Sequence, residues 1–376
     1  MRKKILILTY RYPFKNGPHC SFGQNIFYEA LRSQFEVKGI CIGDKDETDD
    51  NFIAIKWDTG IIKKIFNLVQ LKPIRQSHYH SILFQKAIDK ILDTFKPDFI
   101  YVEHTVMAQY VKLKIPGIKI IFYDDESIIY VKSHKLLKTF KERTKNLFME
   151  RAEWEAIKIS DIILTISDQE RDFLRKKSHN KIIEYVPYGI DTAYYYYNWE
   201  PDKDKIKILF LGNYDHYPNR EAVKFIFKEL SPRFLDNKQV EFIIVGRNTK
   251  EIKNLIRSNM KVYDDVGDVR KFYWTSTLFI APIFYGGGLR TKILEAASCG
   301  VPIIMSSLAN NGFNFMDKEE VLVAETAEDY INIFYKILSE KYSKYLLKLS
   351  NNAAEKIKSN YSINSIQSRY LNYLSL

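Results

Sequence analysis

The sequence predicts an α/β protein with two Rossmann-like domains, each a doubly wound parallel sheet. Short, continuously apolar runs alternate with longer helical patterns along the chain, and continuous apolarity indicates strands that are covered on both faces. The same rhythm restarts near residue 206, after a polar and aromatic segment without periodicity at 189–205. With 376 residues the chain also exceeds the length of one typical domain. Repetition of strand and helix predicts parallel sheets in both halves.

The expected strands follow one another in each half. They lie at 4–10, 37–43, 98–103, 118–124, 161–167 and 182–188, then at 206–212, 240–246, 261–267, 277–283 and 301–307. Helical patterns between them include 21–33, where Ser21 and Gln24 are spaced as a capping box, and 141–160.

The domain limits follow from this alternation of strand and helix patterns. We expect an N-terminal domain over 1–190, a linker over 191–205 and a C-terminal domain over 206–361, with a last helix over 362–376 that packs back on the first domain. The cleft between two such domains is the expected ligand site. The four tyrosines of the linker, Tyr194–Tyr197, form either a functional platform or a packed cluster at the domain boundary.

Charge and cysteine content narrow the class of protein. The formal net charge is +11, from 57 Lys and Arg against 46 Asp and Glu, and it is spread along the chain. This charge suits nucleic acid, an anionic membrane or phosphorylated small molecules, but an even spread does not indicate a nucleic-acid-binding arm. Three widely spaced cysteines predict a reducing compartment without disulfides. No apolar run is long enough to span a membrane, so we expect a cytoplasmic protein. Two basic, apolar segments at 61–75 and 131–148 either bind the inner face of the cell membrane or are amphipathic helices packed on their own sheet.

A glycine triplet is the most informative motif. In "IAPIFYGGGLRTKILEAASCGVPII" (280–304), the residues Gly286, Gly287 and Gly288 separate an expected strand from an expected helix that ends at Gly300. Glycine lets the backbone approach a ligand and adopt positive φ. The amides around Leu289 and Arg290 would then open a helix N-terminus, which binds anions.

The side chains after the triplet suit a nucleoside diphosphate. Arg290 and Lys292 would supply positive charge, and Glu295 can accept hydrogen bonds from ribose or sugar hydroxyls. The alternative is a tight turn with a solvated Lys292–Glu295 pair. Neither a G-x-G-x-x-G fingerprint after a first strand nor a P-loop is present, which argues against NAD enzymes and P-loop NTPases.

Segments on both sides of the triplet resemble the C-terminal domain of family 4 GT-B glycosyltransferases. They are "FLGNYDHYPNREAVKFIFKEL", "FIIVGR" and "DVGDVRKFYWTSTLFIAPIFYGGGLRTKILEAASCGVPIIMSS". The first half is similar more loosely, through "PFKNGPHCSFGQNIFYEAL", "MERAEWEAIKISDIILTISDQERDFL" and "VPYGIDT". The resemblance implies a metal-independent, hexosyltransferase-like enzyme that transfers a sugar from a nucleotide-diphosphate sugar with retention of configuration. It needs no cofactor besides this donor, and many family members build bacterial surface polysaccharides.

The resemblance also assigns the donor-binding residues. They are Gly212, Asn213, Arg247, Val269, Gly286, Gly287, Gly288, Leu289, Arg290, Thr291, Lys292 and Glu295. Val269 ends the loop that would read the base, and Glu295 would hold the ribose. Where the family often carries two glutamates with seven residues between them, this chain has Gly287 and Glu295. Alternatively, Gly212 is only a turn residue at the end of its strand and does not contact the donor.

The N-terminal domain should hold the acceptor and any base. Gly17 and His19 lie in the loop after the first strand, and His104 ends another strand. Asp125 and Glu126 follow a third strand and could position an acceptor hydroxyl or take its proton, although Asp125 could equally cap a helix. The expected partners are the nucleotide-sugar donor, a glycan or lipid-linked acceptor and an anionic membrane surface, without nucleic acid.

Two other functions suit the same architecture. One is a nucleotide-sugar 2-epimerase of the GT-B type, for which the glycine-rich loop is a poor match. The other is a non-catalytic nucleotide-sugar-binding protein. This alternative remains because Gly287 stands where the family often has the first of its two glutamates. A covalent protein nucleophile is not expected, because the sequence lacks a G-x-S-x-G elbow.

Overall fold

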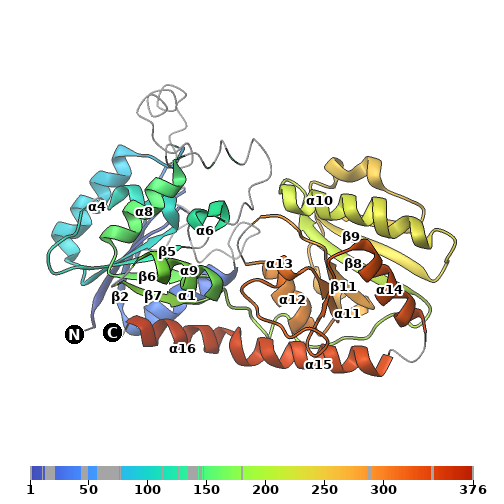
Figure 1. Cartoon of the computed structure of the whole chain (residues 1–376). Coiled ribbons are helices and arrows are strands. Elements are labelled where there is room, and N and C mark those ends of the chain that lie inside the picture. The colour runs from blue at the N-terminus through green and yellow to red at the C-terminus, as the bar shows by residue number, and fades with distance from the viewer. Residues whose placement is uncertain are drawn as a thin grey trace. The chain divides into compact units, whose positions relative to one another are not determined.

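The chain divides into two compact units, each built on one parallel sheet with flanking helices (Figure 1). The computed structural model describes residues 2–10, 12, 22–43, 50–56, 76, 78–111, 113–124, 127–133, 143, 146, 148–178, 181–286, 289–339 and 343–374, with the side chains of 22–27 left out. The first unit contains Met1–Tyr188, Gly286–Gly288 and Ile366–Leu376. The second contains Gly189–Tyr285 and Leu289–Ser365.

The sheet of the first unit has the order β3-β2-β1-β4-β5-β6-β7, and all of its neighbours are parallel. Its strands are β1 (Lys4–Leu8), β2 (Glu36–Ile42), β3 (Phe52–Ile55), β4 (Phe99–Glu103), β5 (Lys119–Asp124), β6 (Ile162–Thr165) and β7 (Ile182–Tyr185). The chain winds one way from β1 to β3 and the other way from β4 onward. Loops that follow β1 and β4 therefore diverge, which is where ligands bind in such sheets.

Helices cover both faces of this sheet because its strands are apolar on both sides. Ile88 of α4 (Ile82–Phe95), Ile157 of α8 (Met149–Ile159) and Leu174 of α9 (Asp168–Lys177) share one core cluster with alternate strand residues. On the other face, Tyr28 of α1 (Phe22–Gln34) packs on Tyr101, with ring centroids 6.3 Å apart.

The last helix, α16 (Ile363–Leu374), brings Tyr370 to this second face, where its ring centroid lies 6.3 Å from that of Tyr123. Short helices complete the unit: α5 (His104–Met107), η2 (Ala108–Tyr110) and α6 (Ile128–Ser133).

The sheet of the second unit has the order β10-β9-β8-β11-β12-β13 and is also parallel. Its strands are β8 (Ile206–Asn213), β9 (Val240–Arg247), β10 (Met260–Asp264), β11 (Leu278–Ala281), β12 (Ile303–Met305) and β13 (Leu322–Val323). Its helices are α10 (Tyr217–Phe225), η3 (Ile226–Leu230), η4 (Ser231–Phe234), η5 (Thr249–Leu255), α11 (Arg270–Thr275), α12 (Thr291–Cys299), α13 (Ser307–Asn310), α14 (Ala327–Leu338) and α15 (Ser343–Asn360). The winding reverses between β8 and β11.

Each strand expected from the apolar runs is present, with shifts of a few residues at its ends. The structure adds two strands that the sequence reading missed, β3 and β13, both short and at the edges of their sheets. The helix expected over 141–160 is interrupted at Phe148, and most of its first part, 141–147, lies outside the described residues. The helix α8 begins only at Met149, because Phe148 has a left-handed φ of 63°, which a helix cannot contain.

Candidate functional site

The predicted donor residues gather where the winding of the second sheet reverses. Two loops leave the sheet there, one between β8 and α10 and one between β11 and α12. They lie close together, since the ring centroids of Tyr217 and Tyr285 are 6.0 Å apart. Ligands of open parallel sheets bind at such a reversal, beyond the carboxyl ends of the strands.

Two glycines let the strand ends of β8 and β9 touch. Gly212 and Gly246 are paired in register, and Gly246 has a φ of 154°. A Cβ atom on Gly246 would lie 1.7 Å from the carbonyl oxygen of Gly212, and one on Gly212 would lie 2.8 Å from Cγ of Asn219. A side chain at 246 would therefore collide with backbone, and one at 212 would force the Asn219 side chain to move. This steric requirement gives the two glycines a packing role whether or not a phosphate lies beside them.

The glycine-rich loop leads directly into α12. Gly286 has a φ of 83°, in the left-handed region that favours glycine; Gly287 and Gly288 lie outside the described residues. Arg290 occupies the N-cap position of α12, and its side chain does not cap the helix but donates from Nη1 to the carbonyl oxygen of Leu308 at 3.0 Å. The partly exposed residues Leu289 and Arg290 and the exposed Thr291 lead into the first turn of α12, and the free amides of a helix N-terminus can bind an anion. As expected, the helix ends at Gly300, with a φ of 86°.

Lys292 joins the two loops. Its ammonium donates to the carbonyl oxygen of Leu211 at 2.9 Å and to Oδ1 of Asn219 at 2.6 Å. It also lies 4.7 Å from the ring centroid of Phe210. Burial and the nearby Arg290 charge lower the pKa of Lys292 to about 7, against the opposing effect of Glu295. An anion that binds at the site would therefore stabilise the protonated form of Lys292 and raise its pKa again.

Glu295 lies one turn further along α12, where Tyr273 of α11 holds it. The Tyr273 hydroxyl donates to Oε2 of Glu295 at 2.9 Å. Burial raises the pKa of Glu295, and the hydrogen bond from Tyr273 and the charge of Lys292 oppose this rise. One carboxylate oxygen is oriented by tyrosine, so the other can accept a hydrogen bond from a ligand hydroxyl.

The lowered pKa of Lys292 predicts proton uptake when a nucleoside diphosphate binds. At pH 8 the amine is mostly neutral in the unliganded protein, and a bound diphosphate would restore its pKa towards the ordinary value of about 10.4. We expect calorimetry of UDP binding in buffers of different ionisation enthalpy to show uptake of about one proton at pH 8. Uptake should fall towards zero at pH 6, where Lys292 already carries its proton. The same uptake at pH 8 in a Lys292→Gln variant would contradict this assignment.

The other predicted donor residues surround this centre. Asn213 at the end of β8 accepts at Oδ1 from the amide of Asp215 at 3.0 Å and is in register with Arg247. The Arg247 guanidinium is 40% exposed and donates from Nε to Oδ1 of Asp265 at 3.1 Å. Val269 directly precedes α11, the helix that carries Tyr273. The structure therefore brings the described donor residues to the strand ends of one sheet, while their contacts with a donor remain predictions.

His104 lies at the corresponding reversal of the first sheet. It follows β4 with a φ of 66°, and its Nδ1 accepts from the amide of Val106 at 3.1 Å. An amide can only donate, so the proton of the neutral imidazole is on Nε2. In this tautomer Nε2 is a hydrogen-bond donor and Nδ1 an acceptor. To act as a base, His104 would first have to release the Val106 amide, so its catalytic role remains a prediction.

The other predicted residues of the N-terminal domain, Gly17, His19, Asp125 and Glu126, lie outside the described residues. Their described neighbours form a buried acidic cluster. Asp124 ends β5, and Glu153 of α8 accepts from the Ser127 hydroxyl at 2.6 Å and from the Ile129 amide at 2.9 Å. Burial raises the pKa of Glu153 to about 7, and hydrogen bonds with Asp124, Ser127 and Ile129 oppose this rise. Glu153 thereby fixes the start of α6, which follows the predicted acids directly.

The sequence reading missed three residues that shape these sites. Asn219 and Tyr273 contact Lys292 and Glu295, and Glu153 holds the start of α6. Asn219 lies in the first turn of the helix after β8, a position that faces the strand end, and this was an available signal. Nothing in the local pattern marks the other two.

Two negative findings concern the described parts of the chain. None of the described helices is long and apolar enough to cross a bilayer. Within the described ranges, no group of three or more His, Cys, Asp or Glu side chains is placed to hold a metal ion.

Comparison with known families identifies both halves of the chain. A model described as "Glycosyl transferases group 1" matches residues 205–340, and one described as "Glycosyltransferase Family 4" matches residues 27–194. A protein of Klebsiella pneumoniae, described as an uncharacterized 44.6 kDa protein in the cps region, is 20% identical over 289 residues, which is 70% of each chain.

Solved glycosyltransferase structures share the fold. Sucrose-phosphate synthase from Thermosynechococcus elongatus has a TM-score of 0.75 at 14% identity, over 100% of this chain and 98% of that one. Anabaena HepE in complex with UDP-glucose has a TM-score of 0.68 at 13% identity, over 99% of both chains. At these identities the structures establish the fold alone, and they confirm the predicted pair of Rossmann-like domains. Because one glycosyltransferase model matches each half of the chain and the fold is shared with solved glycosyltransferases, the chain is a GT-B glycosyltransferase, similar to family 4 in its first half and to group 1 in its second half.

Proposed function

We propose that this glycosyltransferase moves a hexose from a nucleotide-diphosphate sugar to a glycan or lipid-linked acceptor, with retention of configuration and without a metal ion. The observation that carries the proposal is the position of Lys292, which extends from the first turn of α12 and places its ammonium against the end of β8 and the first turn of α10. Lys292, Arg290 and the N-terminus of α12 all carry positive charge or partial charge near the carboxyl end of β8. Such a group of charges stabilises the negative charge of a diphosphate.

In the proposed reaction the bond between the anomeric carbon and the diphosphate breaks, and the acceptor oxygen forms a new bond to the same carbon. The acceptor proton passes to a base. The diphosphate leaves with additional negative charge, which Lys292, Arg290 and the first turn of α12 would stabilise. Glu295 would orient the ribose by accepting from its hydroxyls. These fixed cations would supply the charge that a metal ion supplies in other transferases.

Two relatives support the choice of donor and pathway. The structural neighbour HepE was solved with UDP and with UDP-glucose, which makes UDP the first nucleotide to test. The Klebsiella relative is described as encoded in a cps region, which favours a role in surface polysaccharide synthesis. The family match favours transfer over the epimerase and non-catalytic alternatives, and analysis of products distinguishes a new glycoside from an epimerised sugar.

A thermal-shift measurement tests the donor site. We expect one of UDP, GDP, ADP or CMP to stabilise the protein, because a ligand at 100 times its dissociation constant adds about 2.7 kcal/mol to the free energy of unfolding. For a domain of this size that corresponds to a rise of about 5 °C or more in Tm. The matching monophosphate should give a smaller rise when a diphosphate is preferred. Equal Tm values with all four nucleotides in a folded sample would contradict the proposed site.

We further propose that the enzyme works at the cytoplasmic face of the membrane, to which its positive charge attracts it. The net charge is +11, and the sequence offers two basic, apolar segments at 61–75 and 131–148, which lie largely outside the described residues. We expect binding to vesicles that contain phosphatidylglycerol at low salt, and release as the ionic strength rises. Vesicles of phosphatidylcholine alone are the control. Equal binding to both, or none at low salt, would contradict the proposal.

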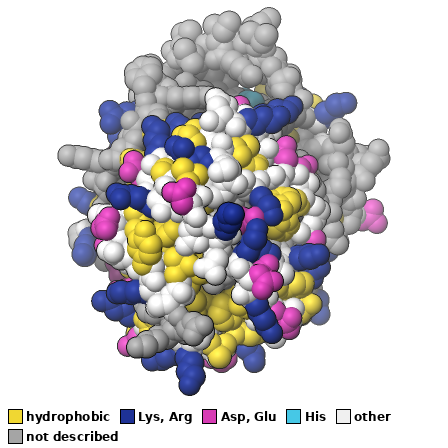
Figure 2. Space-filling model, turned by 90° about the vertical axis from the view of Figure 1, so that its right-hand side faces the viewer, with side chains coloured by type: hydrophobic (Ala, Val, Ile, Leu, Met, Phe, Trp, Pro, Cys, Tyr) yellow, Lys and Arg dark blue, Asp and Glu magenta, His cyan; other side chains and the backbone are white. Residues whose placement is uncertain are grey.

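Nucleic acid is not proposed as a partner. On the face drawn in Figure 2, Lys and Arg side chains are dispersed among Asp and Glu rather than gathered into a stripe. A nucleic-acid backbone requires a continuous basic surface. We therefore propose that the positive net charge attracts the phosphorylated donor and an anionic membrane surface.

A further inference from the structure

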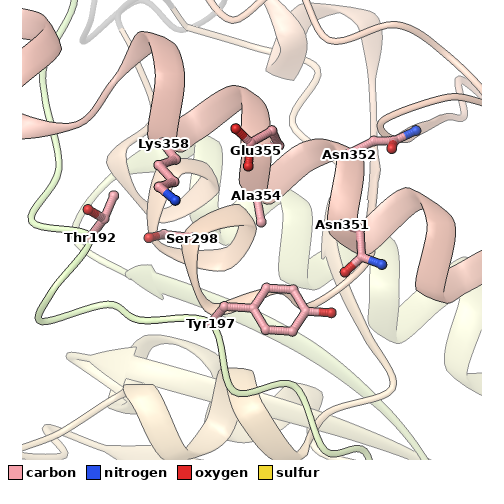
Figure 3. Close-up of a pocket in the computed structure, with 8 residues that line it drawn as sticks. All are labelled: Thr192, Tyr197, Ser298, Asn351, Asn352, Ala354, Glu355 and Lys358. Atoms are coloured by element: carbon pink, nitrogen blue, oxygen red, sulfur yellow. The ribbon is translucent and has the colours of Figure 1, made fainter.

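The second unit contains a cavity whose residues are separate from the donor site. Its volume is about 620 Å³, and residues of the linker, the end of α12 and one face of α15 line it (Figure 3). The lining residues are Thr192, Tyr197, Ser298, Asn351, Asn352, Ala354, Glu355 and Lys358. The volume lies within the range of about 300–1,000 Å³ that is usual for sites of small ligands.

The chemistry of the lining indicates the class of ligand. Thr192, Ser298, Asn351 and Asn352 carry hydroxyl or amide groups, which both donate and accept hydrogen bonds. Ser298 uses its proton on the carbonyl oxygen of Tyr195 at 2.5 Å, and its oxygen can still accept. Glu355 and Lys358 contribute opposite charges. A ligand with many neutral hydroxyl groups matches this lining, whereas a phosphate or an apolar molecule does not.

Tyr197 adds a fixed aromatic surface. Its side chain is 41% exposed, and its hydroxyl is hydrogen-bonded to Oγ of Ser350 at 2.9 Å. The ring lies against Gly300, where an added Cβ would come within 2.6 Å of Cε2. Two anchors hold the ring before any ligand arrives, so little conformational entropy would be lost on binding. The face of such a ring is suited to the C–H groups on one side of a pyranose.

The remaining tyrosines of the linker have other contacts. Tyr194 lies beneath the Arg270 guanidinium, 4.0 Å from its ring centroid, and Tyr196 packs on Trp274 with centroids 4.7 Å apart. Two tyrosines attach the linker to α11, and Tyr197 lines a cavity.

We propose that this cavity is a second carbohydrate-binding site, which holds a short neutral oligosaccharide. An anchored glycan chain would raise the effective concentration of acceptor ends near the enzyme. That benefit rests on the proposed glycan acceptor, but the binding itself does not depend on the donor site.

Saturation-transfer NMR on the full chain tests the proposal. The probes are maltotriose, cellotriose and lactose, with excess UDP present to occupy the donor site. We expect transfer to at least one probe, and an affinity lower by about tenfold in Tyr197→Ala and in Asn351→Ala. Asn351 is exposed on α15, so its variant keeps the test valid if Tyr197→Ala does not fold. Tyr335→Ala is the matched control, because Tyr335 is an exposed tyrosine of the same unit and does not line the cavity.

Three results would overturn the proposal. They are the absence of transfer to every probe in the wild-type protein, equal binding by wild type and both cavity variants, and tighter binding of glucose 6-phosphate than of the neutral sugars. A protein that binds an oligosaccharide but no nucleoside diphosphate would contradict the proposed function alone. A nucleotide response without oligosaccharide binding would contradict only this second site.

Discussion

Replacing Lys292 by alanine is expected to lower kcat/KM for sugar transfer by about 10²–10³-fold, the usual loss when one donor to a developing negative charge is removed. The ammonium is held by the Leu211 carbonyl oxygen and by Asn219, so it is already in position when the diphosphate departs. Most of the loss should appear in kcat, because the charge on the leaving group grows in the transition state. Initial rates with the nucleotide sugar identified by thermal shift measure the effect.

Two further variants separate charge from packing. Lys292→Gln can still donate to the Leu211 carbonyl oxygen but carries no charge, so it should lose nearly as much activity while unfolding at a temperature closer to wild type. Lys224→Ala removes a lysine of α10 whose partner is Glu221, 2.7 Å away, and should leave the rate unchanged. Full activity in Lys292→Gln would show that the ammonium charge is not used in the reaction.

Replacing Glu295 by alanine is expected to weaken nucleotide binding by about 10–100-fold, because a hydrogen bond to a charged group contributes about 1.5–3 kcal/mol. The carboxylate is oriented by Tyr273, so its second oxygen is positioned for a ribose hydroxyl. Titration with UDP and with 2′,3′-dideoxy-UDP measures the effect. Wild type should discriminate between the two ligands, and the variant should not.

The matched controls for Glu295 are Tyr273→Phe and Glu328→Ala. Tyr273→Phe removes only the orienting hydroxyl and should weaken UDP binding less than Glu295→Ala does. Glu328 is an exposed acid in the first turn of α14, and its removal should change nothing. If Glu295→Ala bound both nucleotides as tightly as wild type does, the ribose assignment would be wrong.

Much of the fold follows from local pattern, because buried parallel strands are apolar on both faces and their ends carry turn residues. The glycine-rich loop was predictable for the same reason, since a strand, a glycine triplet that begins with the positive φ of Gly286 and a helix start are neighbours in sequence. The contact between Lys292 and Asn219 was not, because 73 residues separate the two side chains. Their meeting depends on the pairing of β8 with β11, which only the sheet order determines.

Other failures have different physical causes. The strand β3 is short and has a neighbour on one side only, so its pattern is weak. At Phe148 tertiary context imposes a left-handed conformation that no propensity scale assigns to phenylalanine. The buried Glu153 resembles a surface residue in a charged helical stretch, and only the packing of α8 on α6 shows that it is buried.

The contact between Gly246 and Gly212 bears on any attempt to retarget this enzyme to a new donor by directed evolution. A library that randomises whole strand ends would spend most of its members on misfolded proteins, because any side chain at 246 collides with the neighbouring backbone. Arg247 and Val269 are not glycines held by such a contact, and both are predicted to bind the donor. Useful diversity therefore lies at positions such as Arg247 and Val269, where a side chain can change without collision with the backbone of a neighbouring strand.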